Sequence, residues 1–294
     1  MTIRSLLILA LLAGCASLSA SGFQSLESGV DARSAALGFT LATGGGDPVA
    51  GFGNPAALVQ GPGRTVSFTL NHWAQAVQSG HAGLVFSGQD AAFGLSLYYS
   101  EIGEIEHRIV PSRDPIGTFS AHDFVTGLSY GLRVLPGVSA GVSLRSYYQK
   151  IYLEDAWGLG GDLGVLWSLP DRMTRIGGAV QHVGRSGVLK NERIALPTTF
   201  RIGASRTLAL SSLSGMVLVE AVVERDAPFH FHTGVELVWD ELLCLRAGYL
   251  SGYETRNVTF GAGFRFRHYA LDYTVAPFQS GLGDMHLLSA LFLW

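Results

Sequence analysis

The chain has 294 residues, of which 48% are hydrophobic and only 15% are charged, and its formal net charge is −3. The charged fraction lies far below the roughly 25% of an ordinary soluble domain. Together with the small net charge, this composition excludes a disordered chain and a basic nucleic-acid-binding surface. Two cysteines cannot build a disulfide framework.

The first twenty residues are predicted to be an export signal. Arg4 precedes the apolar run 6–13, which is too short to span a bilayer but suits a signal peptide. Cleavage is expected after Ala20 or after Ala16. An alternative is that residues 12–15 form a bacterial lipoprotein box, in which Cys15 would be lipidated. Either route takes the protein out of the cytoplasm.

The segment 21–63 lacks a regular period and is rich in small residues. The stretch 29–38 indicates a turn followed by a short, tightly packed element, and a glycine-rich turn follows at 43–48. Asn54 and Pro55 are expected to make a turn into the first strand, because Asn bonds nearby backbone and Pro fixes the chain direction.

From residue 64 onwards, apolar residues alternate with polar or small ones. In the run 138–150, for example, Val142 and Leu144 alternate with Ser143 and Arg145. Such alternation predicts strands with one apolar and one polar face. The runs are 64–76, 81–88, 91–101, 120–134, 138–152, 156–168, 174–184, 198–208, 214–225, 229–239, 242–251, 256–267, 269–278 and 284–294.

Fourteen strands of about ten residues predict an all-β fold, a 14-stranded antiparallel transmembrane β-barrel over 64–294 in a bacterial outer membrane. A soluble β-sandwich would carry more charge on its outward face. Short connections such as 88–90 and 267–268 fall on the predicted periplasmic side. The chain ends on the alternating aromatics Phe292 and Trp294, which resemble the terminal signal of outer-membrane barrels.

Charged residues within the strands are expected to face the lumen, because facing lipid would cost several kcal/mol. Ion pairs that fill the barrel and a ligand or transport site are the two interpretations. The candidates are Arg145, Asp162, Arg201, Arg246 and Arg265, together with Glu220 and Glu236.

Catalytic and metal-binding patterns are weak. His230 and His232 share one strand face but lack an obvious third ligand, and no nucleophile motif precedes a helix. We therefore expect neither an enzyme nor a metal or other cofactor.

The two longest connections, 101–119 and 184–197, fall on the predicted external side and are candidates for partner binding. The first carries charge beside apolar residues, a mixture that suits a protein interface. Alternatively, 105–110 extends the neighbouring strands above the membrane. The charged candidates are Glu104, Glu106, His107, Arg108 and Arg113.

The segment before the barrel carries a family resemblance. Residues 32–34 read Ala-Arg-Ser, 36–38 read Ala-Leu-Gly, Asp47 lies in the following turn, and 54–58 read Asn-Pro-Ala-Ala-Leu. This order resembles the PorV/PorQ family of outer-membrane barrels, itself similar in architecture to the FadL fatty-acid transporters.

The resemblance implies a hatch over 21–63 at the periplasmic mouth, with Asp31, Arg33, Asn54 and Pro55 as its motif and with Arg33 reaching a carboxylate. It also implies an anchoring role in type IX protein secretion, with secretion-system proteins and outer-membrane lipid as partners. The alternative is a FadL-like channel for a hydrophobic solute. The hatch would either gate the barrel or only cap it.

Overall fold

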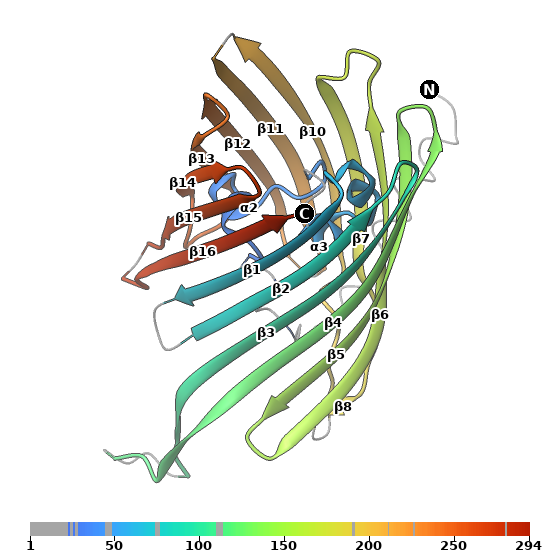
Figure 1. Ribbon diagram of the computed structural model, residues 1–294. Helices are drawn as coiled ribbons and strands as arrows, with labels where there is room; N and C mark the ends of the chain where they lie inside the picture. Colours follow the sequence, from blue (N-terminus) through green and yellow to red (C-terminus); the bar gives the residue numbers. More distant parts are fainter. Residues whose placement is uncertain are drawn as a thin grey trace, which may run out of the picture.

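In the computed structural model, the alternating runs pair edge to edge and close into one antiparallel barrel (Figure 1). The structure describes residues 23, 26, 29–44, 49–73, 77–109, 114–189, 192–210, 212–225, 227–279 and 281–294. The export signal and Cys15 lie outside these residues, as do Asp47 and Arg113. No helix within the described part is long and apolar enough to cross a membrane.

Among the described residues, fourteen strands form the barrel, so the predicted fold is confirmed. They are β1 Arg64–Trp73, β2 Val77–Ser87, β3 Ala91–His107, β4 Gly117–Leu135, β5 Val138–Ile151, β6 Glu154–Ser168, β7 Thr174–Ser186, β10 Thr199–Leu210, β11 Leu213–Glu224, β12 Phe229–Trp239, β13 Leu243–Ser251, β14 Val258–Phe266, β15 Tyr269–Pro277 and β16 Asp284–Leu293. A separate two-stranded sheet joins β8 Val188–Leu189 to β9 Glu192–Arg193. The barrel closes where β1 pairs with β16, with Phe68 opposite Ala290.

The two faces of each strand differ as the sequence pattern requires. On β1, Phe68 and Leu70 are 59% and 70% exposed, whereas Ser67 and Thr69, which alternate with them, are buried. Large apolar side chains therefore cover the outside, where lipid would contact them, and polar ones face the lumen. The short connections 88–90, 136–137 and 267–268 all lie at one end, which by the same rule is the periplasmic end.

The structure corrects the extent of the long external loop expected at 101–119. Strands β3 and β4 continue into it, across a bulge between Ile102 and Ile105, and pair as far as His107 and Gly117. Glu104 lies in this bulge with a φ of 55°. The alternative interpretation, that the neighbouring strands extend beyond the membrane, fits this segment, and β3 and β4 extend well past the ends of β1 and β2 (Figure 1).

The other predicted external loop, 184–197, is also largely ordered. Strand β7 continues to Ser186, and β8 and β9 pair within the loop. Ile194 and Leu196 are buried against residues of the barrel interior. This segment therefore covers the lumen from the external side.

Inside the barrel lies a plug, which we define as residues 29–44 and 49–60. It contains the helices α2 Ala32–Ala36 and α3 Ala50–Gly53 and the 3-10 helix η2 Pro55–Gln60. Helix α2 packs on β13 to β16, and η2 packs on β2 to β6. The side chain of Asp31 caps α2 by accepting from Ser34 N, and Asn54 caps η2 by accepting from Ala56 N.

Glycines on the inner wall let the plug backbone approach closely. A Cβ atom at Gly141 would lie 2.4 Å from the backbone N of Ala56, and one at Gly177 would lie 2.0 Å from the carbonyl O of Ala42. Neither distance leaves room for a side chain. Contact between the plug and the wall thus explains some of the 38 glycines of the chain.

Candidate functional site: the plug, its anchors and the periplasmic cavity

Three groups of charged side chains join the plug to the barrel wall, and the first is centred on Arg145 of β5. Its Nε donates to Asp162 of β6 at 2.6 Å, and both side chains are fully buried. The same guanidinium donates to the carbonyls of Gly51 and Phe52 in the plug at 3.2 and 3.1 Å. It also lies 4.0 Å from the centre of the Phe52 ring. The ion pair thereby fixes helix α3 against the wall.

The second group is centred on Glu220 of β11. One carboxylate oxygen accepts from Arg201 Nη1 at 2.8 Å, and the other accepts from the backbone N of Leu41 and of Ala42, both at 2.7 Å. Glu220 therefore faces the lumen, where it is almost completely buried. This one carboxylate therefore accepts from two backbone N–H groups of the plug. Neither group has a hydrogen-bond partner in a β-sheet.

The third group surrounds Glu236 of β12. Arg33 of α2 donates to both carboxylate oxygens at 3.0 Å, and Arg246 of β13 donates to one of them at 2.5 Å. Arg246 also donates to Asp272 of β15 at 2.6 Å. Arg265 lies farther away, with 3.6 Å between its Nη2 and Glu236. Arg33, Arg246 and Arg265 thus gather around the two carboxylates of Glu236 and Asp272.

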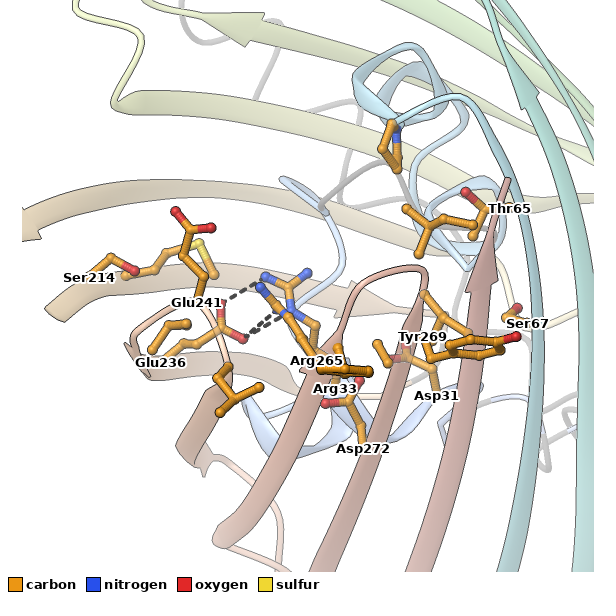
Figure 2. A pocket seen from close by; sticks show the side chains of 18 of the residues that line it. Asp31, Arg33, Thr65, Ser67, Ser214, Glu236, Glu241, Arg265, Tyr269 and Asp272 are labelled. Atoms are coloured by element: carbon orange, nitrogen blue, oxygen red, sulfur yellow. Dashed lines mark hydrogen bonds and ion pairs between the residues drawn. The ribbon is translucent and has the colours of Figure 1, made fainter. Parts of the chain in front are cut away.

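This third group forms one wall of a cavity of about 850 Å³ at the periplasmic mouth (Figure 2). Figure 2 shows Arg33 joined to Glu236 on this wall, with Thr65 and Ser67 of β1 on the other side of the view. Apolar side chains such as Met216 and Leu291 complete the lining. The lumen below the plug is therefore a roomy, partly charged vestibule.

Asn54 and Pro55 lie within the plug and do not lead directly into the first strand, since they begin η2, which ends at Gln60 before β1 starts at Arg64. Asn54 is completely buried, and its Nδ2 donates to the carbonyls of Ala42 and Val165 at 2.7 and 3.1 Å. One side chain thus ties two parts of the plug to each other and to β6.

The external half of the lumen holds an apolar cluster of aliphatic and aromatic side chains that the sequence analysis did not find. It joins Phe52 of the plug to wall residues and to the external segment that carries Leu196. Its buried members are Phe23, Leu26, Val30, Val49, Phe52, Tyr98, Val125, Tyr147, Ala156, Ile194 and Leu196. We call it the luminal apolar cluster. Its residues come from segments too far apart in sequence for periodicity to have grouped them.

His230 and His232 of β12 lie beside Tyr253, which belongs to the external connection 252–257. The His230 ring stacks on the Tyr253 ring at 3.8 Å between centroids, and His232 Nε2 is 3.0 Å from the Tyr253 hydroxyl. Burial and the nearby Glu224 carboxylate raise the pKa of Tyr253 to about 12. In the described part of the chain, no three His, Cys, Asp or Glu side chains could hold a metal together.

Of the described partner-loop candidates, Glu104, Glu106 and His107 lie on β3, and Arg108 follows its last residue. Glu106 and Arg108 form an exposed ion pair at 2.7 Å. The His107 ring lies 6.3 Å from that of Phe119 and 5.3 Å from that of Tyr152. Glu104, Glu106 and His107 are therefore carried by a paired strand rather than by an open loop.

The chain was compared with known proteins. No family model and no curated protein matches it. Among solved structures it resembles the toluene transporter TodX of Pseudomonas putida, with 14% identity and a TM-score of 0.64 over 90% of this chain and 96% of that chain. The CymD monoaromatic hydrocarbon channel gives 14% identity and a TM-score of 0.68 over 90% and 98%. A FadL homologue of Pseudomonas aeruginosa gives 14% and 0.59 over 90% and 98%.

At these identities the likeness shows the fold, that of a FadL-type outer-membrane barrel, and the protein is an integral outer-membrane β-barrel. The PorV/PorQ resemblance finds no support in these comparisons. The expectation of a secretion role is wrong, because the solved barrels that share the fold are described as transporters and channels of small molecules. None of these three is described as an enzyme.

Proposed function

We propose that the protein is an outer-membrane channel for hydrophobic small molecules, with the plug as its hatch. The luminal apolar cluster is the observation that carries this proposal. A water-filled pore for polar solutes would line its external half with polar groups, whereas here Phe52, Val125 and Leu196 meet in the interior. Apolar solutes gain free energy in such surroundings by leaving water.

The anchors of the plug support a hatch that can be released. Each of the three charged groups joins the plug to the wall by a few hydrogen bonds, and no covalent bond to the wall is among the described contacts. Such contacts can be exchanged for water when the plug shifts. The fold that the chain shares with TodX and CymD, described as a toluene transporter and a hydrocarbon channel, agrees with this function.

Binding of an apolar dye to the purified protein tests the proposal. We expect 1-N-phenylnaphthylamine to bind in the luminal apolar cluster with a rise in fluorescence, and Leu196→Arg to weaken that binding at least tenfold by placing a charge there. Leu153→Arg is the matched control, because Leu153 is 76% exposed at an external turn. Heat-modifiable migration on gels confirms that each variant is folded. Equal binding by the two variants would count against the cluster as the solute site.

A further inference from the structure

The outer face of the barrel changes from apolar to polar near its external end. On β1, the outward residue Leu70 is followed by His72 as the next outward residue. His72 pairs with His286 of β16 and with Gln78 of β2, which in turn pairs with Glu101 of β3. These four strands lie side by side in Figure 1. Such a change marks the border between the hydrocarbon and headgroup layers of a membrane.

A groove of about 470 Å³ lies at this border. Its lining includes Leu288, Leu70 and Tyr99 of β16, β1 and β3, which are 45%, 70% and 40% exposed. Gly80 is the outward residue of β2 between Leu70 and Tyr99. A Cβ atom at Gly80 would have only the carbonyl O of Thr69 within 4 Å. The space left by the missing side chain is bordered by apolar groups, whose dispersion contacts favour an acyl chain.

Two histidines lie at the polar end of the groove. His72 and His286 are exposed, and both line it. Residues that pair directly across antiparallel strands have Cβ atoms about 5 Å apart, so both imidazoles can reach one ligand group. The Nδ1 atom of His286 lies 2.7 Å from the Tyr273 hydroxyl, which leaves Nε2 for another partner. Imidazole N–H groups donate hydrogen bonds, and the oxygens of a phosphate accept them.

The carboxylate of the groove lies at its opposite edge. Among the described residues that line the groove, only Glu101 is acidic. It accepts a hydrogen bond from the Tyr99 hydroxyl at 3.1 Å. Because β3 lies two strands from β1, the backbones at Glu101 and His72 are about 10 Å apart. The histidine end of the groove is therefore free to receive an anionic group.

We propose that the groove binds a phosphate-bearing lipid of the outer leaflet. One acyl chain lies over Gly80 between Leu70 and Tyr99, and the phosphate accepts hydrogen bonds from His72 and His286. A lipid is the fitting occupant because the outer face of the barrel contacts the membrane at this border. The site lies outside the barrel, so it is independent of the luminal apolar cluster and of the proposed channel function.

Native mass spectrometry of the purified protein with added lipid tests the site. The probes are dioleoylphosphatidylglycerol and dioleoylglycerol, which have the same acyl chains and differ in the phosphate-bearing head. We expect the wild type to bind the phospholipid at least fivefold more tightly than the diacylglycerol. His72→Ala/His286→Ala should abolish that preference. Gly80→Leu, which fills the groove, should weaken binding of the phospholipid at least fivefold.

Two variants are matched controls. Gly178 is an outward glycine on β7, paired with the exposed Ile202, and a Cβ atom there would also have one atom within 4 Å, the carbonyl O of Arg201. His268 is an exposed histidine in the periplasmic turn between β14 and β15. Gly178→Leu and His268→Ala should bind the phospholipid as the wild type does, and heat-modifiable migration confirms that each variant is folded. The site is refuted if the folded wild type does not prefer the phospholipid, or if Gly178→Leu weakens its binding as much as Gly80→Leu.

Discussion

Arg33 of the plug and Glu236 of the barrel wall are joined by two parallel hydrogen bonds of 3.0 Å each. The two residues lie 203 positions apart in the sequence, and their contact closes one side of the periplasmic cavity. A two-point pair of this kind holds α2 in orientation as well as in position.

Removing the Arg33 side chain should loosen the hatch. Arg33→Ala takes one cation from a carboxylate that retains Arg246, and we expect a loss of about 1–3 kcal/mol in the free energy of unfolding. Single-channel recordings in planar bilayers should show more frequent and larger openings than the wild type.

The control for Arg33→Ala is Arg108→Ala, which breaks the exposed ion pair with Glu106. Exposed pairs contribute little, so its recordings should match the wild type. If Arg33→Ala also leaves the recordings unchanged, the plug only caps the barrel and does not gate it.

A side chain at Gly141 should displace the plug. Gly141→Val would place atoms within 2.4 Å of the plug backbone at Pro55 and Ala56, and overpacking of this kind costs about 1–3 kcal/mol. We expect limited proteolysis to cut the plug faster than in the wild type. Gly117→Val is the matched control, because a Cβ at Gly117 meets nothing within 4 Å. Equal cleavage of the two variants would contradict close contact between η2 and the wall.

The Tyr253 hydroxyl should stabilise the external connection 252–257. It contacts His232 at 3.0 Å and donates to Glu224 at 3.4 Å, so Tyr253→Phe should lower the free energy of unfolding by about 1 kcal/mol. Urea titration in detergent measures the change. Tyr130→Phe, on the lipid-facing side of β4, should have no comparable effect.

The pH dependence of the same residue follows from its raised pKa. Folding favours the protonated phenol, whose pKa is raised from its ordinary value of 10 to about 12. Its contribution is therefore complete below pH 10 and is lost as the pH rises from 10 towards 12. The stability difference between wild type and Tyr253→Phe should shrink over that interval. A difference that stays constant up to pH 12 would show that the phenol is not buried as described.

The β3–β4 hairpin should be dispensable for barrel assembly. Replacing residues 104–114 by a short Gly/Ser linker removes the pairs beyond the bulge but leaves the pairing from Ala91 to Ile102 intact. We expect normal heat-modifiable migration and unchanged dye binding. Failure to assemble would mean that the hairpin nucleates the pairing of β3 with β4.

The sequence was sufficient to predict the barrel because lipid and lumen impose opposite requirements on alternate residues. Phe68 and Leu70 against Ser67 and Thr69 illustrate this on β1. The pattern was weaker in the β3–β4 hairpin, since strands that continue into water need no apolar face and a bulge shifts their register at Ile102.

The internal contacts were less accessible from the sequence. Alternation placed Arg145 and Asp162 in the lumen, but it could not pair Arg33 with Glu236 or show that the plug carbonyls of Gly51 and Phe52 accept from Arg145. Those contacts depend on how the plug lies in three dimensions. The luminal apolar cluster was missed for the same reason, because Leu196 reaches it from an external segment.

The most direct measurement of the proposed function is the initial rate of uptake of radiolabelled toluene by cells that carry the protein in their outer membrane, at a concentration where diffusion across that membrane limits entry. We expect a rate several-fold above that of cells with an empty vector. The Leu196→Arg variant should give the empty-vector rate and Leu153→Arg the wild-type rate. If the wild-type protein, present and folded in the outer membrane, takes up toluene no faster than the empty-vector cells, the proposed channel function is contradicted.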